Sequence, residues 1–145
     1  MRDYDRLLDQ IEQFINKYNQ IESSSRDYGA GVLLSRTEIH LIAAIGDNPG
    51  IGVNKLAVLK GVSDGAVSQM IRKLVQKNLV NKAISKESEA KVELTLTEKG
   101  HVCYLDHKEY HEKSNKKWGL LLDEFDDQNY EKIQNMLESA NKMLD

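Results

Sequence analysis

The chain has 145 residues, of which 40% are hydrophobic and 30% charged, the composition of an ordinary folded protein with one domain or a small module with helical extensions. No apolar run is long enough to span a bilayer, and the charged start MRDYDRLLDQ lacks an apolar signal core, so we expect a cytoplasmic protein with no membrane partner. The single cysteine excludes an internal disulfide and suits a reducing compartment.

Helical spacing dominates the first part of the chain. The first helix is indicated by apolar residues at the helical period, namely Leu7, Leu8, Ile11, Phe14, Ile15 and Tyr18, and the polar run SSSRDYGAG ends it. A second helix begins at Ser35, because Ser35 and Glu38 have the spacing of a capping box and Leu34 and Ile39 that of a hydrophobic staple. This helix stops before Asn48-Pro49-Gly50, which contains the only proline.

The segment VNKLAVLKGVSDGAVSQMIRKL has the spacing of a helix-turn-helix, with helices at 53–60 and from 64 to about 78. Ala57 is small enough for two crossing helices to approach, and Gly61 tolerates the left-handed turn between them. Ser63 is a good N-cap for the second, recognition helix, while Val67 and Met70 fall where that helix packs against the first. An ordinary helical hairpin inside a core is the alternative interpretation.

A β-hairpin follows, because two alternating stretches flank the polar tip SKESEAK. Helix-turn-helix plus hairpin is a winged helix. Residues 51–91 carry eight Lys and Arg against three Asp and Glu, a net charge of +5, so the remainder carries −8 within the total of −3. This asymmetry favours a phosphate-facing patch. The residues expected to contact DNA are Ser63, Asp64, Gly65, Ala66, Ser68, Gln69, Arg72 and Lys73 in the recognition helix, with Lys86 and Lys91 in the wing.

Two further helices complete the predicted fold, which is mainly α with a small β-hairpin wing. Thr97 opens a long polar helix that runs to about Trp118. The last helix begins at Asp126, where Phe125 and Tyr130 have the spacing of a staple.

The stretches GVSDGAVSQMIRKLVQKNLV and LTLTEKG resemble the MarR family of bacterial transcription regulators, and the resemblance covers nearly the whole chain. It implies a homodimer, expected to be a repressor, that places two recognition helices in successive major grooves of a pseudo-palindromic operator. It also implies an N-terminal dimerisation helix and loop at 1–34, a winged helix-turn-helix at 35–100 and C-terminal dimerisation helices at 101–145. The family's wing usually carries Asp-x-Arg, but Ser88 and Ala90 stand at those positions here, so we expect a weaker contribution of the wing to DNA binding.

Three of the four histidines and the only cysteine lie in HVCYLDHKEYHEK, residues 101–113. Cys103, His107 and His111 share one helix face at i, i+4 and i+8. His107 and His111 are spaced to chelate one zinc ion, whereas Cys103 and His111 are separated by about 12 Å of helix rise. Cys103 and His111 therefore cannot both join the same ion as His107. Because Cys103 has no basic neighbour in sequence except His107, we expect it to be an inert, partly buried thiol.

The resemblance extends to the metal site of the zinc-sensing branch of the family, whose primary ligands match Glu22, His40, His107 and His111. Three imidazoles and a carboxylate form a suitable set for zinc. The resemblance does not extend to the branch's secondary site: its cysteine falls near Tyr28, its glutamate at Ile39, and only Asp106 keeps a carboxylate.

We therefore expect a DNA-binding transcriptional regulator that zinc modulates, and not an enzyme. A regulator that responds to a small organic ligand at the same histidines is the main alternative. A zinc hydrolase is a further alternative, although the chain has no H-E-x-x-H, no glycine-rich phosphate loop and no serine nucleophile motif. The last alternative is a protein-interaction module built on a winged helix.

Overall fold

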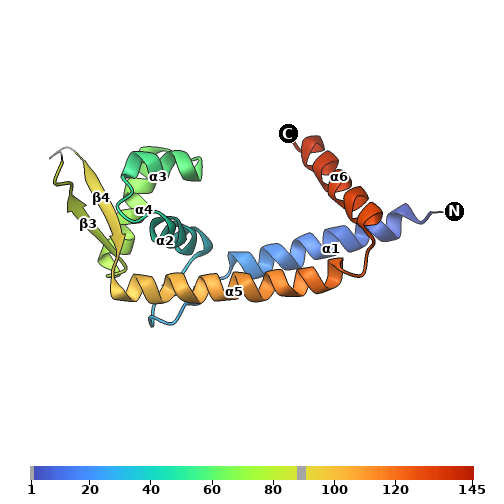
Figure 1. The fold of residues 1–145 in the computed structure, drawn as a ribbon, viewed down its shortest axis with the longest axis horizontal. Helices are drawn as coiled ribbons and strands as arrows, with labels where there is room; N and C mark the ends of the chain where they lie inside the picture. Colours follow the sequence, from blue (N-terminus) through green and yellow to red (C-terminus); the bar gives the residue numbers. More distant parts are fainter. Residues whose placement is uncertain (1, 88–90) are drawn as a thin grey trace. The chain divides into compact units, whose positions relative to one another are not determined.

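The computed structural model describes residues 2–87 and 91–145 and divides into two compact units, Met1–Lys108 and Glu109–Asp145. Within the first unit, α1 (Tyr4–Ser23) leads to a short hairpin of β1 (Arg26–Asp27) and β2 (Leu33–Leu34). The helices α2 (Arg36–Asp47), α3 (Val53–Lys60) and α4 (Asp64–Gln76) follow, and then β3 (Val80–Ile84) and β4 (Val92–Leu96), as Figure 1 shows. The helix α5 (Glu98–Leu122) continues into the second unit, which also contains α6 (Asp127–Met143).

This architecture confirms the predicted fold class, mainly α with a β wing. The hairpin β1–β2 was not expected, because its two-residue strands are too short to give a periodic signal. Among the described residues, no helix is long and apolar enough to cross a membrane. The functional boundaries expected at residues 34 and 100 stay predictions, since compactness alone assigns no function.

Capping residues set the helix starts as the sequence predicted. The Ser35 Oγ accepts a 3.3 Å hydrogen bond from the Glu38 N–H, and the Glu38 carboxylate accepts one of 2.9 Å from the Ser35 N–H. The Thr97 Oγ1 accepts from the Gly100 N–H at 3.0 Å where α5 begins. That helix ends at Leu122, beyond the expected Trp118, because three leucines with high helix propensity extend it.

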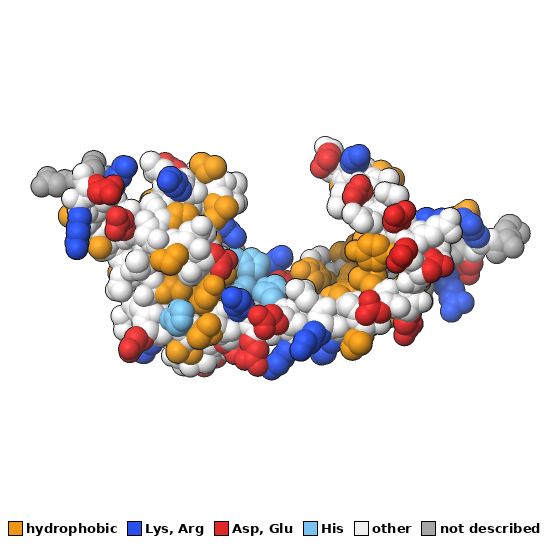
Figure 2. All heavy atoms as spheres, in the orientation of Figure 1, with side chains coloured by type: hydrophobic (Ala, Val, Ile, Leu, Met, Phe, Trp, Pro, Cys, Tyr) orange, Lys and Arg blue, Asp and Glu red, His pale blue; other side chains and the backbone are white. Residues whose placement is uncertain are grey.

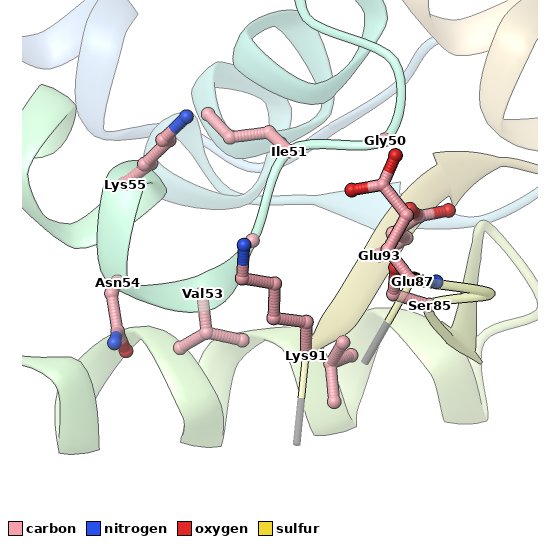
Figure 3. Close-up of a pocket in the computed structure, with 11 residues that line it drawn as sticks. Gly50, Ile51, Val53, Asn54, Lys55, Ser85, Glu87, Lys91 and Glu93 are labelled. Atoms are coloured by element: carbon pink, nitrogen blue, oxygen red, sulfur yellow. Dashed lines mark hydrogen bonds between the residues drawn. The ribbon is translucent and has the colours of Figure 1, made fainter. Parts of the chain in front are cut away.

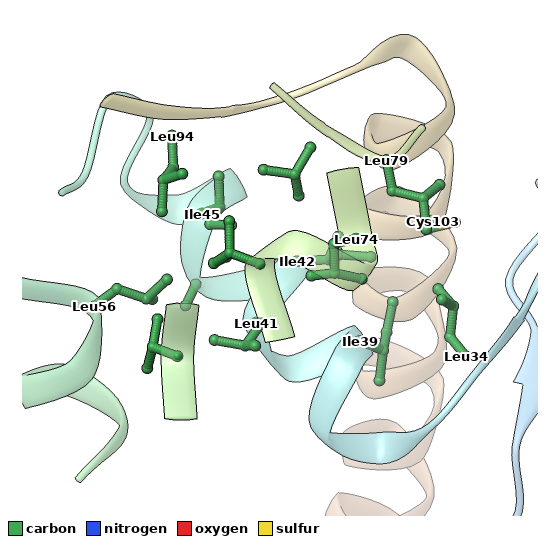
Figure 4. Close-up of a cluster of buried hydrophobic side chains, with 14 of the residues drawn as sticks. Leu34, Ile39, Leu41, Ile42, Ile45, Leu56, Leu74, Leu79, Leu94 and Cys103 are labelled. Carbon is green, nitrogen blue, oxygen red and sulfur yellow. The ribbon is translucent and has the colours of Figure 1, made fainter. Parts of the chain in front are cut away.

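A single hydrophobic core holds α2, α3, α4, the wing and the start of α5 together (Figure 4). Its fully buried members include Leu34, Ile39, Leu41, Ile42, Ile45, Leu56, Leu74, Leu79 and Leu94. Burial of each such side chain contributes about 1.5–3 kcal/mol of transfer free energy. Cys103 reaches into the same cluster from α5, so the core fixes the helix that carries His107.

Two glycines allow α5 to approach its neighbours closely. A Cβ at Gly100 would overlap the carbonyl oxygen of Leu79, and one at Gly46 would overlap the ring of Tyr104. The hydroxyl of Tyr104 also donates a 2.7 Å hydrogen bond to Asp47 at the end of α2. These contacts hold α5 against α2, the two helices that carry His107 and His40.

The helices α1 and α6, both fully described, contain no buried residue. Their apolar side chains lie at the surface, as do many hydrophobic side chains in the space-filling view (Figure 2). The exposed apolar residues of α1 include Leu7, Leu8, Ile11, Phe14, Ile15, Tyr18 and Ile21, and those of α6 include Tyr130, Met136, Leu137 and Met143. Apolar stripes of this extent are typical of surfaces that bind a partner.

Candidate nucleic-acid interface and metal centre

The helix-turn-helix has the geometry that its sequence predicted. Ala57 is 1% exposed between α3 and α4, and Gly61 adopts the left-handed conformation at φ 64°. The Ser63 Oγ accepts a 3.2 Å hydrogen bond from the Ala66 N–H and so caps α4. Val67 is fully buried and Met70 packs against the core, which confirms both as the contact between the two helices.

The two faces of α4 differ in character. Val67, Ile71 and Leu74 are buried in the core, whereas Gln69, Arg72 and Lys73 are exposed. Of the other expected DNA contacts in and before this helix, Ser63, Asp64 and Gly65 are exposed, and Ala66 and Ser68 are half-buried. The exposed face therefore presents the amide of Gln69 and the cations of Arg72 and Lys73 next to one another, at positions i, i+3 and i+4. These groups can bind base edges and phosphates.

The wing is an antiparallel hairpin with Val80 opposite Leu96 and Ile84 opposite Val92. Ile51 adds a bridge to Leu94, which the sequence did not predict. The expected contacts Lys86 and Lys91 are both exposed on the wing. Ser88 and Ala90, which replace the family's Asp-x-Arg, lie outside the described residues.

A pocket of about 470 Å³ separates the wing from the start of α3 (Figure 3). Its lining includes the side chains of Lys55 and Lys91 and, opposite them, Glu87 and Glu93. Lys55 is an exposed cation beside the wing that was not selected as a DNA contact from the sequence. Its place in the basic segment 51–91, in the first turn of α3, is the signal that could have identified it.

An ion pair joins α4 to α2. The Lys77 ammonium donates a 2.7 Å hydrogen bond to Glu38 Oε1 and another, of 3.3 Å, to the carbonyl of Leu33. Burial by itself raises the pKa of the Glu38 carboxyl, but hydrogen bonds from Lys77 and Ser35, with the charge of Lys77, lower this pKa below its ordinary value. The recognition helix is thus tied to the first turn of the helix that carries His40.

Three of the four expected metal ligands lie together. The rings of His40 on α2 and His107 on α5 have centroids 5.4 Å apart, and His107 is 8% exposed. His111 follows His107 by one turn of α5 and is exposed. The ligand nitrogens of the three histidines all lie within 4.8 Å of one another. Three imidazoles at this separation fit the donor chemistry of zinc.

The fourth expected ligand, Glu22, is not a member of this group among the described residues. Its Oε2 forms an ion pair with the Nε of Arg36 at 2.8 Å, and its side chain is 18% exposed. Glu22 as a metal ligand therefore stays a prediction.

The positions of the secondary metal site have other roles here. Tyr28 and Ile39 are buried in the core, and Tyr28 meets the His107 ring edge-on at 6.0 Å between centroids. Asp106 forms a 3.7 Å ion pair with Arg26, whose guanidinium lies over the Tyr28 ring. The Tyr28 ring, held under the Arg26 guanidinium, thus packs against the buried His107.

Cys103 is fully buried rather than partly buried as expected. Burial raises the pKa of its thiol, and the nearby carboxylates of Asp27 and Asp106 raise this pKa further. The reactive thiolate is therefore disfavoured, in agreement with the inert thiol expected from the sequence.

Comparison with known sequences identifies the winged domain. Residues 34–89 match the model of the MarR family. The transcriptional regulator ZitR of Lactococcus lactis subsp. cremoris is 26% identical over 136 residues, which are 90% of this chain and 93% of ZitR. The HTH-type transcriptional regulator YhjH of Bacillus subtilis is 26% identical over 115 residues, which are 79% of this chain but only 65% of YhjH.

Solved structures share the fold along nearly the whole chain. Lactococcus lactis ZitR in complex with DNA has a TM-score of 0.79 at 24% identity and covers 96% of this chain and 98% of its own. Streptococcus pneumoniae FabT in complex with DNA has a TM-score of 0.74 at 23% identity, with coverage of 98% and 97%. The winged segment 34–89 is thus similar to the MarR family, and the chain shares the winged-helix fold of these solved structures.

Proposed function

We propose that the protein is a repressor that binds a pseudo-palindromic operator as a homodimer and that zinc at the histidine cluster modulates this binding. The observation that carries the proposal is the clustering of His40, His107 and His111 in a chain of winged-helix fold. ZitR, which shares the fold, is described as zinc-responsive. The cluster includes His40 of α2, which is the helix that Lys77 ties to the recognition helix.

Binding of DNA would rest on the exposed face of α4. The amide of Gln69 suits the donor and acceptor pair of adenine, and Arg72 and Lys73 suit guanine or phosphate. Ser63, Asp64, Gly65, Ala66 and Ser68 lie at the start of the same helix, whose N–H groups favour phosphate. Lys86 and Lys91 would add phosphate contacts from the wing.

A second copy of the chain is the partner that the exposed apolar stripes of α1 and α6 support. Each stripe would be costly to leave in water. A twofold axis would present two recognition helices to two half-sites about 34 Å apart, one helical turn of DNA.

Zinc would be held by the imidazoles of His40, His107 and His111, with Glu22 proposed as a fourth ligand. A zinc ion in such a site supplies cross-linking rather than reaction chemistry, since it fixes several side chains at once. The residues of this chain then determine the response: His40 belongs to α2 and His107 to α5, so a shared ion would restrain these two helices together.

The first experiment is fluorescence anisotropy of an operator fragment with wild type and with the His107→Ala/His111→Ala double variant, while zinc is titrated against a chelator. We expect zinc to change the affinity of the wild type for DNA severalfold and to leave the variant unchanged. Arg72→Ala is the matched control, because it should weaken DNA binding at every zinc concentration and keep the zinc response. Equal binding by wild type with and without zinc would rule out the metal proposal.

An organic effector is the second candidate, favoured by the Arg26 guanidinium 4.5 Å from the centre of the Tyr28 ring, close to His107. A cation and an aromatic ring beside imidazoles suit an anionic or phenolic ligand. A zinc-independent regulator whose DNA affinity responds to such a compound would support this reading. The relatives are regulators rather than enzymes, so hydrolysis is not proposed.

The proposed regulator would act on DNA in the cytoplasm.

A further inference from the structure

Arg36 occupies a position from which it can act on the histidine cluster. It begins α2 and precedes His40 by four residues, so the two side chains lie on the same face of the helix, one turn apart. Its guanidinium Nε binds Glu22 Oε2 at 2.8 Å. The carboxylate of Glu22, at the end of α1, is thus paired with a residue that stands one helical turn from a candidate metal ligand.

This ion pair restricts what the carboxylate can do. The Glu22 side chain is 18% exposed, so water screens the pair less than it screens a fully exposed one. Arginine keeps its charge at any pH at which the protein is folded and cannot give up the carboxylate by losing a proton. A metal ion that recruits Glu22 must therefore break its ion pair with a permanently charged partner.

We propose that Arg36 lowers the affinity of the histidine cluster for zinc by holding the Glu22 carboxylate away from it. The inference rests on the proposed metal site and goes beyond it, because it assigns a regulatory role to a residue that is not a ligand. Two effects act in the same direction. Arg36 competes for the carboxylate, and its positive charge, one turn from His40, repels an incoming dication.

The test is a competition titration of zinc between the purified protein and a chromophoric chelator, without DNA. Arg36→Gln should bind zinc severalfold more tightly than wild type, and Glu22→Gln more weakly. In the double variant Glu22→Gln/Arg36→Gln most of the gain should be lost, because no carboxylate remains to be released. Arg6→Gln is the matched control: it removes an exposed arginine from α1 about 24 Å of helix rise from Glu22 and should leave zinc affinity unchanged.

A cobalt titration reads the ligand set directly. The visible absorption of bound Co²⁺ should change on Glu22→Gln and stay the same on Arg36→Gln, because Arg36 affects the affinity and not the set of ligands. Weaker or unchanged zinc binding by Arg36→Gln would overturn the inference while the metal site itself stands. A wild type that binds no zinc would overturn both. Arg36→Ala should also bind zinc more tightly than wild type, and it replaces Arg36→Gln if that variant does not fold.

Discussion

The Lys77 ammonium lies 2.7 Å from Glu38 Oε1, so the end of α4 is bonded to the first turn of α2. The other oxygen of this carboxylate accepts from the Ser35 N–H within the capping box. One side chain therefore caps the helix that carries His40 and anchors the recognition helix. This arrangement ties the helix that carries one candidate metal ligand, His40, to the recognition helix.

Removal of the Lys77 ammonium should destabilise the fold. Its side chain is 32% exposed and that of Glu38 13%, so the bond is charge-assisted and partly shielded. Lys77→Met should lower the free energy of unfolding by about 1–3 kcal/mol, measured by urea denaturation at neutral pH. Lys73→Met, on the exposed face of the same helix, should change it by less than about 0.5 kcal/mol. Equal values for the two variants would contradict a structural role for the pair.

The same carboxyl predicts a dependence of stability on pH. The pKa of Glu38 in the folded state lies below its ordinary value of 4.5, so its ionised form favours folding. This contribution is complete above pH 4.5 and disappears as the pH falls through the lowered pKa. Glu38→Gln does not titrate at this position, so its deficit in unfolding free energy relative to wild type should be largest near neutral pH and shrink below pH 4.5. If this difference in unfolding free energy stays constant from pH 7 down to the lowest pH at which the protein folds, the lowered pKa of Glu38 does not contribute to stability.

Glycine substitutions should separate close packing from helix propensity. Gly100→Ala would place a methyl group against the carbonyl oxygen of Leu79. We expect it to lower the free energy of unfolding by about 1–3 kcal/mol. Gly65→Ala meets no atom within 4 Å and lies inside α4, so it should stabilise the protein by about 0.5–1 kcal/mol. Thermal unfolding followed by circular dichroism measures both. Similar shifts in Tm for the two variants would show that α5 can move away from Leu79.

Local signals made most of the fold predictable. The caps at Ser35, Ser63 and Asp126 and the turn at Gly61 each depend on a few neighbouring residues, and the structure has all of them. The bridge between Ile51 and Leu94 could not be predicted, because it pairs residues far apart in the sequence and has no periodic pattern.

The candidate site was predictable in part. The spacing of His107 and His111 follows from helix geometry alone, whereas the approach of His40 depends on how α2 packs on α5. The pairing of Glu22 with Arg36 was not anticipated, because a surface ion pair between two separate helices has no signature in the sequence. The resemblance to the zinc-sensing branch named Glu22 as a ligand but gave no information about its neighbours.

The exposed face of α4 predicts how DNA binding should respond to single substitutions. If Arg72 and Lys73 contact phosphates, Arg72→Ala and Lys73→Ala should each weaken binding to all sequences and reduce the slope of log K against log salt by about one. Gln69→Ala should instead relax the preference at one base pair, with a loss of about 1–3 kcal/mol on the preferred operator and little change on other sequences. Anisotropy titrations at several salt concentrations measure both effects.

Lys132→Ala on α6 is the control for charge, because it removes an exposed lysine from a helix outside the winged domain and should leave the salt slope unchanged. An equal reduction of the slope by Lys132→Ala would mean that net charge, rather than the recognition helix, governs binding. Unchanged slopes for Arg72→Ala and Lys73→Ala, with sequence preference altered, would assign these two side chains to base edges instead of phosphates. With Lys132→Ala unchanged, the salt slopes and the sequence preferences together identify which contacts of α4 position the protein on DNA and which read the sequence.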